Sequence, residues 1–220
     1  MNTRPLDALK IPLAITIAFW VIEFAENIFG FNIHEWGIYP RKFDGIIGIV
    51  ISPFLHADFS HLLSNSTSFL LLGFSILFFF PRIGQAVFIN IYMLTGLGVW
   101  LFGRPAYHIG ASGLVYGFAS FLFFSGIFRK DIKSTMVSLS VAFLYGGMLY
   151  GIFPNDPKIS FESHLIGAIV GLITAYYYKN YDKEEEVSYS SSSHSAIFEG
   201  YHNIENKYMK YHFKQQEEEK

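Results

Sequence analysis

A serine hydroxyl with small neighbours, Ser112 in the segment Gly110-Ala111-Ser112-Gly113, lies at the start of a long uncharged apolar run. A hydroxyl in that position is a potential nucleophile if a nearby base can take its proton. Small residues at the end of an apolar run also let two helices pack closely in lipid. The tetrapeptide alone is therefore compatible with chemistry or with packing, and the rest of the chain must decide.

Three other polar residues at the edges of apolar stretches could assist such a nucleophile. His61 and Asn65 are four residues apart, which places them on one face of a helix. His164 begins a later apolar stretch and is followed by Gly167 and Gly171, a spacing that lets two helices approach closely. Taken singly, each of these residues could also be a structural histidine or a polar contact between helices.

The elements that must position these residues are membrane-spanning helices. Of the 220 residues, 51% are hydrophobic and only 15% are charged, which lies outside the usual composition of soluble domains. A helix of about 20 residues crosses a bilayer, and irregular backbone is not tolerated in lipid. We therefore expect an all-α polytopic membrane protein with six helices. The predicted spans are residues 11–31, 61–80, 84–103, 111–128, 134–153 and 162–178.

The orientation of these spans follows from the lysines and arginines in the short connections. Most of them lie on one side if the N-terminus is cytoplasmic, so both termini are predicted to face the cytoplasm, with the plasma membrane as the default location. The second, fourth and sixth spans then all enter from the outer face. Ser112, His164, His61 and Asn65 consequently meet at the outer end, where they supply a nucleophile, a base and donors for a developing negative charge.

The rest of the composition narrows the function and the domain organisation. A net charge of -2 does not suggest nucleic-acid binding. Without cysteine there is no thiolate metal site, and we expect neither a metal nor a cofactor. Residues 1–180 are predicted to form the membrane domain. Residues 181–220 are predicted to be a polar cytoplasmic tail, either weakly ordered or carrying a short amphipathic helix.

The joint pattern resembles the rhomboid family of intramembrane serine proteases, over about residues 40–178. Each motif of that family has a counterpart in this chain. In chain order the matching residues are Pro40 and Arg41, His56, His61 and Asn65, Gly110 to Gly113, Tyr116, and His164, Gly167 and Gly171. Some members carry a further histidine four residues before the counterpart of His56, where this chain has Ser52. That position is not part of the catalytic pair.

The resemblance implies a fold and a mechanism. The fold is a six-helix rhomboid-like bundle with an interfacial loop between the first two helices. Ser112 would attack a peptide carbonyl while neutral His164 takes its proton, as a dyad without a carboxylate. The Ser112 backbone N–H, with side-chain donors from His61 and Asn65, would hold the oxyanion, and Tyr116 would contact His164. The substrates would be transmembrane segments of other proteins in the lipid bilayer, entering beside the fifth helix.

Residues 151–161, from the end of the fifth span to the start of the sixth, are a candidate cap over this site. Their Pro-Asn-Asp-Pro segment at residues 154–157 breaks helix, which is compatible with a movable cap or with a plain turn. Gly146 and Gly147 in the fifth span are expected to provide a flexible or a closely packed point.

Two other classes of function remain open on the residues alone. A catalytically silent rhomboid-like protein could bind and escort membrane clients, as derlins do, although those lack the serine and histidine present here. A small transporter would need a polar path to both faces, and the inner halves of the spans hold little besides isolated Ser and Thr. The intramembrane acids Glu23 and Glu26 are instead expected to pair with Arg41 or Lys42 at the outer interface.

Overall fold

The computed structural model describes residues 4–154 and 159–181, and regular structure in these ranges is helical. Residues 155–158 of the predicted cap lie outside the described residues. The predicted tail does too, apart from Tyr181.

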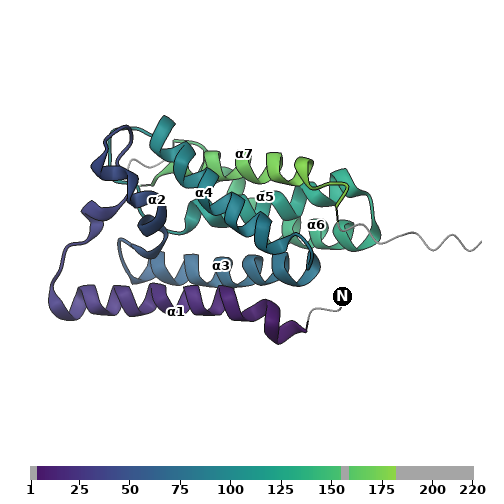
Figure 1. Cartoon of the computed structure of the whole chain (residues 1–220), viewed down its shortest axis with the longest axis horizontal. Helices are drawn as coiled ribbons and strands as arrows, with labels where there is room; N and C mark the ends of the chain where they lie inside the picture. Colours follow the sequence, from purple (N-terminus) through teal and green to yellow (C-terminus); the bar gives the residue numbers. More distant parts are fainter. Residues whose placement is uncertain (1–3, 155–158, 182–220) are drawn as a thin grey trace, which may run out of the picture. The chain divides into compact units, whose positions relative to one another are not determined.

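The described residues form seven α-helices and four 3-10 turns (Figure 1). Their bounds are α1 Pro5–Phe29, η1 His34–Trp36, η2 Asp44–Ile46, α2 Gly48–Ile51, η3 Ser52–Phe54, α3 Phe59–Phe79, α4 Gly84–Phe102, α5 Ser112–Arg129, α6 Ile132–Tyr145, η4 Gly146–Ile152 and α7 Phe161–Tyr177. Five segments are long and apolar enough to cross a membrane, namely α1, α3, α4, α5 and α6 continued by η4. The chain is therefore a multi-pass membrane protein. Helix α7, with 17 residues, is slightly shorter than these.

Helix α1 begins at Pro5, earlier than the predicted start at residue 11. Proline is favourable in the first turn of a helix because its missing N–H would have no partner there. Asp7 in this first turn forms an exposed ion pair with Lys10, at 2.7 Å. Hydropathy excluded these charged residues from the span, whereas the helix continues through them.

The fifth predicted span changes character at Gly146, where α6 gives way to the 3-10 turn η4. Glycine is a poor helix former because it loses more backbone freedom than other residues. A Cβ atom added at Gly146 or Gly147 would meet nothing within 4 Å. These two glycines therefore do not serve close packing, which was one of the two predicted roles.

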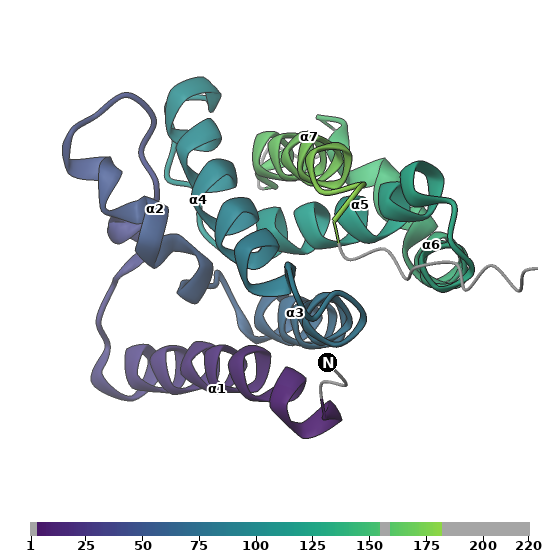
Figure 2. The same ribbon diagram turned by 45° about the vertical axis from the view of Figure 1, so that its right-hand side comes forward.

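Helix α5 is the centre of the bundle and contacts α3, α4, α6 and α7 (Figure 2). Its ring of Phe118 is fully buried and packs against Phe69 of α3 and Phe88 of α4, with centroid distances of 5.6 and 4.7 Å. Buried aromatic rings in such tilted arrangements contribute both area and pair energy to a core. Helix α1 packs on the outside of α3.

Helices α5 and α7 meet backbone to backbone through four glycines. A Cβ on Gly167 would lie 2.0 Å from the carbonyl oxygen of Gly113, and one on Gly171 would lie 2.2 Å from that of Gly117. The two helices run in the same direction, since the successive glycines of one meet those of the other in order. The small-residue spacing predicted for the sixth span is thus matched on α5, where Gly117 was not anticipated.

The connection from α1 to α3 holds the short elements η1, η2, α2 and η3. Helix α2 has four residues, far too few to cross a bilayer, and contacts α4. The Trp36 and Phe43 side chains are exposed, which is the arrangement expected of aromatic residues at a membrane interface.

The predicted pairing of Glu23 and Glu26 with Arg41 or Lys42 is wrong. Glu26 lies 3.5 Å from the His34 ring, and the buried Glu23 carboxylate accepts a hydrogen bond from the Asn27 amide at 3.3 Å. Arg41 instead donates to the carbonyl oxygens at the C-terminal end of α4, of Leu101 at 3.1 Å and Gly103 at 2.8 Å. Unpaired carbonyls at a helix C-terminus attract a cation, and this contact draws Arg41 away from α1.

Candidate active site

Ser112 is the first residue of α5, and the backbone turns at Gly110 just before this helix begins. Gly110 has a φ of 101°, a backbone conformation that glycine adopts without steric cost. The Gly110 N–H donates to the Ser52 carbonyl at 2.9 Å, which ties this turn to η3. A backbone N–H in the first turn of a helix has no acceptor within that helix. The N–H of Ser112 is therefore oriented for an external acceptor.

The Ser112 hydroxyl meets the ring of His164, in the first turn of α7. The His164 Nε2 to Ser112 Oγ distance is 2.8 Å, and the His164 Nδ1 to Gly151 carbonyl oxygen distance is 2.9 Å. A carbonyl oxygen only accepts, so Nδ1 carries the ring proton and Nε2 presents its lone pair to the hydroxyl. This is the tautomer that a general base requires.

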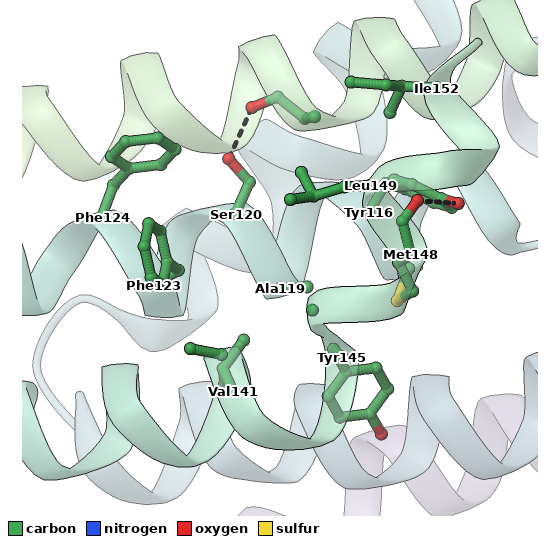
Figure 3. A pocket seen from close by; sticks show the side chains of 13 residues that line it. Tyr116, Ala119, Ser120, Phe123, Phe124, Val141, Tyr145, Met148, Leu149 and Ile152 are labelled. Atoms are coloured by element: carbon green, nitrogen blue, oxygen red, sulfur yellow. Dashed lines mark hydrogen bonds between the residues drawn. The ribbon is translucent and has the colours of Figure 1, made fainter.

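The ring of Tyr116, one turn after Ser112 on α5, stacks on the imidazole of His164. The centroids are 4.2 Å apart and the planes differ by 9°. The Tyr116 hydroxyl donates to the Met148 carbonyl at 2.8 Å, as the dashed line in Figure 3 shows. The turn η4 thus supplies two carbonyls, one to Tyr116 and the other, from Gly151, to His164.

Gly151 must be a glycine for this arrangement to exist. A Cβ atom at this position would lie 2.0 Å from the Tyr116 hydroxyl oxygen and 3.3 Å from His164 Nδ1. Sequence reasoning did not anticipate Gly151, because a hydrogen bond to a backbone carbonyl leaves no signature in residue type. The only available signal was a third glycine in the fifth span, after Gly146 and Gly147.

Two side-chain donors from α3 converge on Gly110, two residues before Ser112. A Cβ atom built on Gly110 would lie 2.9 Å from His61 Nε2 and 3.4 Å from Asn65 Nδ2. The Ala57 N–H donates to His61 Nδ1 at 3.4 Å, so the His61 proton is on Nε2, the atom that faces Gly110. Helix α3 is held here by its N-cap, since Asp58 accepts from the His61 N–H at 2.8 Å.

The Asn65 amide is buried and its Nδ2 has no hydrogen-bond partner among the described residues. A buried donor without an acceptor costs free energy comparable to a lost hydrogen bond. Such a cost is useful where a negative charge develops during a reaction, because the donor is already in place to stabilise it. With the His61 ring and the Ser112 N–H, the Asn65 amide can receive an oxyanion next to the nucleophile.

His56 supports this group from behind His61, and its ring stacks on neither Ser112 nor His164 within the described part of the chain. Its ring, 1% exposed, packs between Phe19 and His61 with centroid distances of 5.3 and 5.2 Å. Burial, together with the neighbouring His61, lowers the pKa of His56 to about 3. His56 is therefore neutral near pH 7 and acts as a packing support behind His61.

An apolar cavity of about 370 Å³ lies between α5, α6, η4 and α7. Figure 3 shows that the Tyr116 ring forms one wall, with Met148 and Leu149 beside it. The Ser120 hydroxyl on α5 donates to the Ala168 carbonyl of α7 at 2.6 Å, so the polar atoms at this wall are mutually paired. His164 does not line the cavity, but the Tyr116 ring that does is stacked on its imidazole.

Comparison with known proteins defines the class to which this fold and site belong. Residues 44–181 match the Rhomboid domain, and the chain belongs to the rhomboid family.

Several relatives align with most of the chain. An uncharacterized protein of Mycobacterium tuberculosis is 36% identical over 174 residues, covering 74% of this chain and 72% of that protein. An uncharacterized protein of Mycobacterium leprae is 32% identical over 171 residues, covering 71% and 66%. The Bacillus subtilis protein YdcA, provisionally named as a rhomboid protease, is 29% identical over 161 residues, covering 71% and 76%.

Proposed function

We propose that this rhomboid-family protein is an intramembrane serine endopeptidase in which Ser112 is the nucleophile and His164 the general base. The observation that carries the proposal is the 2.8 Å contact between Ser112 Oγ and His164 Nε2, with the ring proton held on Nδ1 by the Gly151 carbonyl. A nucleophile, a base within hydrogen-bonding reach and a third group that orients the base are what covalent catalysis requires.

In the first step, Ser112 Oγ forms a bond to the carbonyl carbon of the scissile peptide and gives its proton to His164 Nε2. The electron pair of the C=O double bond moves onto oxygen, which becomes the oxyanion. Donors from the Ser112 backbone, His61 Nε2 and Asn65 Nδ2 stabilise that charge. The Gly151 carbonyl keeps its hydrogen bond to Nδ1 and steadies the imidazolium.

In the second step, the oxyanion re-forms the C=O bond and the C–N bond breaks. The leaving amine takes the proton from His164 Nε2, which leaves an ester between Ser112 and the acyl half of the substrate. Water then attacks the ester carbon and gives a proton to Nε2. Collapse of this second intermediate returns the proton to Ser112 Oγ and releases a carboxylic acid, so the site ends in its starting state.

The membrane arrangement that fits this function has six spans, with α7 as the sixth. Its glycine face lies directly against α5, and local thinning of the bilayer accommodates a helix of 17 residues. Both termini then face the cytoplasm of a plasma membrane, and residues 181–220 form a cytoplasmic tail. Since the chain has no cysteine, Lys158→Cys is expected to react with an impermeant reagent only from the outer side.

The substrates are transmembrane segments of other membrane proteins in the surrounding bilayer. The starts of α3, α5 and α7, which carry Asn65, Ser112 and His164, lie together at one end of the bundle. A peptide that reaches this end does so from within the membrane, where a locally unwound segment exposes its carbonyls. Entry beside α6 and η4 is consistent with the 3-10 geometry of η4, which is weaker than that of an α-helix.

The test is cleavage of a single-pass substrate by the reconstituted full chain, compared with Ser112→Ala and His164→Ala. We expect the wild type to cut the substrate and both variants to leave it intact. Equal cleavage by all three proteins would contradict the proposal. Substrate capture without cleavage by the wild type would favour the silent binder instead.

A further inference from the structure

A second serine–histidine contact lies beside the first and is not explained by the proposed reaction. His108, in the connection from α4 to α5, places Nδ1 2.5 Å from Ser160 Oγ, and its Nε2 lies 3.0 Å from the Arg104 carbonyl oxygen. Because the carbonyl can only accept, Nε2 carries the ring proton and Nδ1 accepts from the Ser160 hydroxyl. The Ser163 hydroxyl, 2.6 Å from Ser160 Oγ, is then the donor to Ser160.

The two contacts cross-link the same two segments in the same register. His108 and Ser112 are four residues apart on one segment, and Ser160 and His164 are four residues apart on the other. Each pair joins residues 52 positions apart in the chain. Any movement of the first turn of α7 along the start of α5 would therefore disturb both contacts together.

The contact between Ser160 and His108 takes the place of the usual N-cap hydrogen bond of a helix. Ser160 is the N-cap of α7, yet its side chain accepts no hydrogen bond from a backbone N–H of that helix. A serine at this position usually accepts from an N–H of the first turn, which stabilises the helix. Here the hydroxyl is directed to His108 instead.

His108 is suited to be a permanent acceptor for that hydroxyl. Its side chain is 2% exposed, and burial lowers its pKa, so the ring stays neutral at pH 7. The Ser160 carbonyl in turn accepts from the His164 N–H at 3.4 Å, which links the contact to the backbone of the proposed base. Arg104, from the same connection as His108, donates to the Ile159 carbonyl at 3.0 Å.

We propose that His108 is a positioning residue of the Ser112–His164 pair: by accepting from Ser160, it fixes the first turn of α7 so that His164 Nε2 stays within reach of Ser112 Oγ. His108 itself touches no reacting atom. The inference rests on the proposed function, because it concerns the rate of a reaction at Ser112. A misplacement of catalytic groups by 1 Å can cost about 10²-fold in rate, so a modest shift of this turn is sufficient for a large effect.

The test uses two matched pairs of variants in the full chain, reconstituted in vesicles. His108→Asn keeps an acceptor oxygen near the position of Nδ1, whereas His108→Gln carries its amide to the position of Nε2 and leaves Ser160 without an acceptor. Ser160→Thr keeps the hydroxyl, and Ser160→Ala removes it. The measurements are kcat and KM for a single-pass substrate, and the rate at which a fluorophosphonate labels Ser112.

We expect kcat and the labelling rate to fall about 10- to 100-fold in His108→Gln and Ser160→Ala, with KM within about twofold of the wild type. The Asn and Thr variants are expected to retain rates within about threefold. Thermal unfolding of each variant checks the fold. If His108→Gln does not fold, Ser160→Ala decides, since it removes a single oxygen atom.

The outcomes separate the two proposals. A wild type that neither cleaves nor is labelled contradicts the proposed function, and the positioning role falls with it. An active wild type whose Ser160→Ala variant reacts at the same rate overturns the positioning role alone. A His108→Asn variant as slow as His108→Gln, or a loss that appears in KM as much as in kcat, overturns it as well.

Discussion

The two serine–histidine contacts of this protein use the same chemical groups in different surroundings. Near Ser112, the Asn65 amide is a buried donor with no partner among the described residues, and the His61 ring faces the same place. Around Ser160, by contrast, the hydroxyl already lies between His108 and Ser163. The site at Ser112 therefore has donors available for a negative charge that develops during the reaction, whereas the Ser160 hydroxyl already has both of its hydrogen-bond partners.

A serine–histidine hydrogen bond does not by itself define a nucleophile. In both contacts the ring nitrogen that faces away from the serine donates to a backbone carbonyl. His164 Nδ1 donates to Gly151, and His108 Nε2 donates to Arg104. What differs is the neighbourhood. Ser112 begins a helix whose first N–H groups are available, and the His61 and Asn65 donors lie against Gly110, two residues before it. Reactivity is expected where donors are left without acceptors, and rigidity where they are already paired.

Removing one hydroxyl at each of the two sites should give the largest difference between them. Ser112→Ala is expected to lower cleavage on the order of 10⁶-fold, the loss found when a serine protease lacks its nucleophile. Ser163→Ala, which removes a hydroxyl from the paired contact, should reduce cleavage by less than about tenfold. Cleavage of a reconstituted substrate measures both. Similar losses in the two variants would show that the contacts do not differ in the way inferred.

The variant Asn65→Ala tests whether the unpaired Asn65 amide stabilises the oxyanion. We expect kcat to fall about 10²- to 10³-fold with little change in KM, because the amide would act on the transition state rather than on the bound substrate. Asn90→Ala is the matched control, since the Asn90 amide donates to the Tyr178 hydroxyl in another part of the bundle. A full rate in Asn65→Ala would argue against a role for that residue.

Gly151→Ala tests the orientation of the proposed base by η4. The added Cβ atom would lie 2.0 Å from the Tyr116 hydroxyl, so the stacked ring or the Gly151 carbonyl must shift. We expect kcat to fall about 10²-fold. Gly147→Ala adds the same atom where nothing lies within 4 Å and should keep the wild-type rate. Equal rates in the two variants would show that the close contact at Gly151 is unimportant.

The smallest expected effect concerns acid stability and His56. Its pKa in the folded protein is about 3, against an ordinary value of 6.5. The unfolded chain therefore binds a proton more readily, and stability falls as pH drops below 6.5. Between pH 6 and 5 the wild type should lose about 1.2 kcal/mol more than His56→Gln. Thermal unfolding at both pH values measures this, and identical pH dependence in the two proteins would contradict it.

The helices and the meeting of Ser112 with His164 could be predicted from the sequence for a simple reason. Apolar runs of membrane length predict the helices. Counting these helices along the chain then predicts at which end of the bundle each polar residue lies. The glycines after His164 indicated a close helix neighbour, which is α5. These are signals carried by residue type and spacing.

What could not be predicted depends on backbone groups and on loops. The Gly151 carbonyl that orients His164 has no residue-type signal, and the contact between His108 and Ser160 joins two connections without periodicity. The pairing expected for Glu23 and Glu26 failed because Arg41 caps the carbonyls at the end of α4. Proximity in a loop depends on hydrogen bonds that only the folded chain reveals.

The two carbonyls that η4 provides have a consequence for how this segment can vary among related chains. The acceptors for Tyr116 and His164 belong to the backbone of Met148 and Gly151, so the side chain at position 148 takes no part in either bond. Substitutions that preserve the turn leave the imidazole oriented. Mutational tolerance in η4 should therefore be uneven, and narrowest at Gly151, where no Cβ fits.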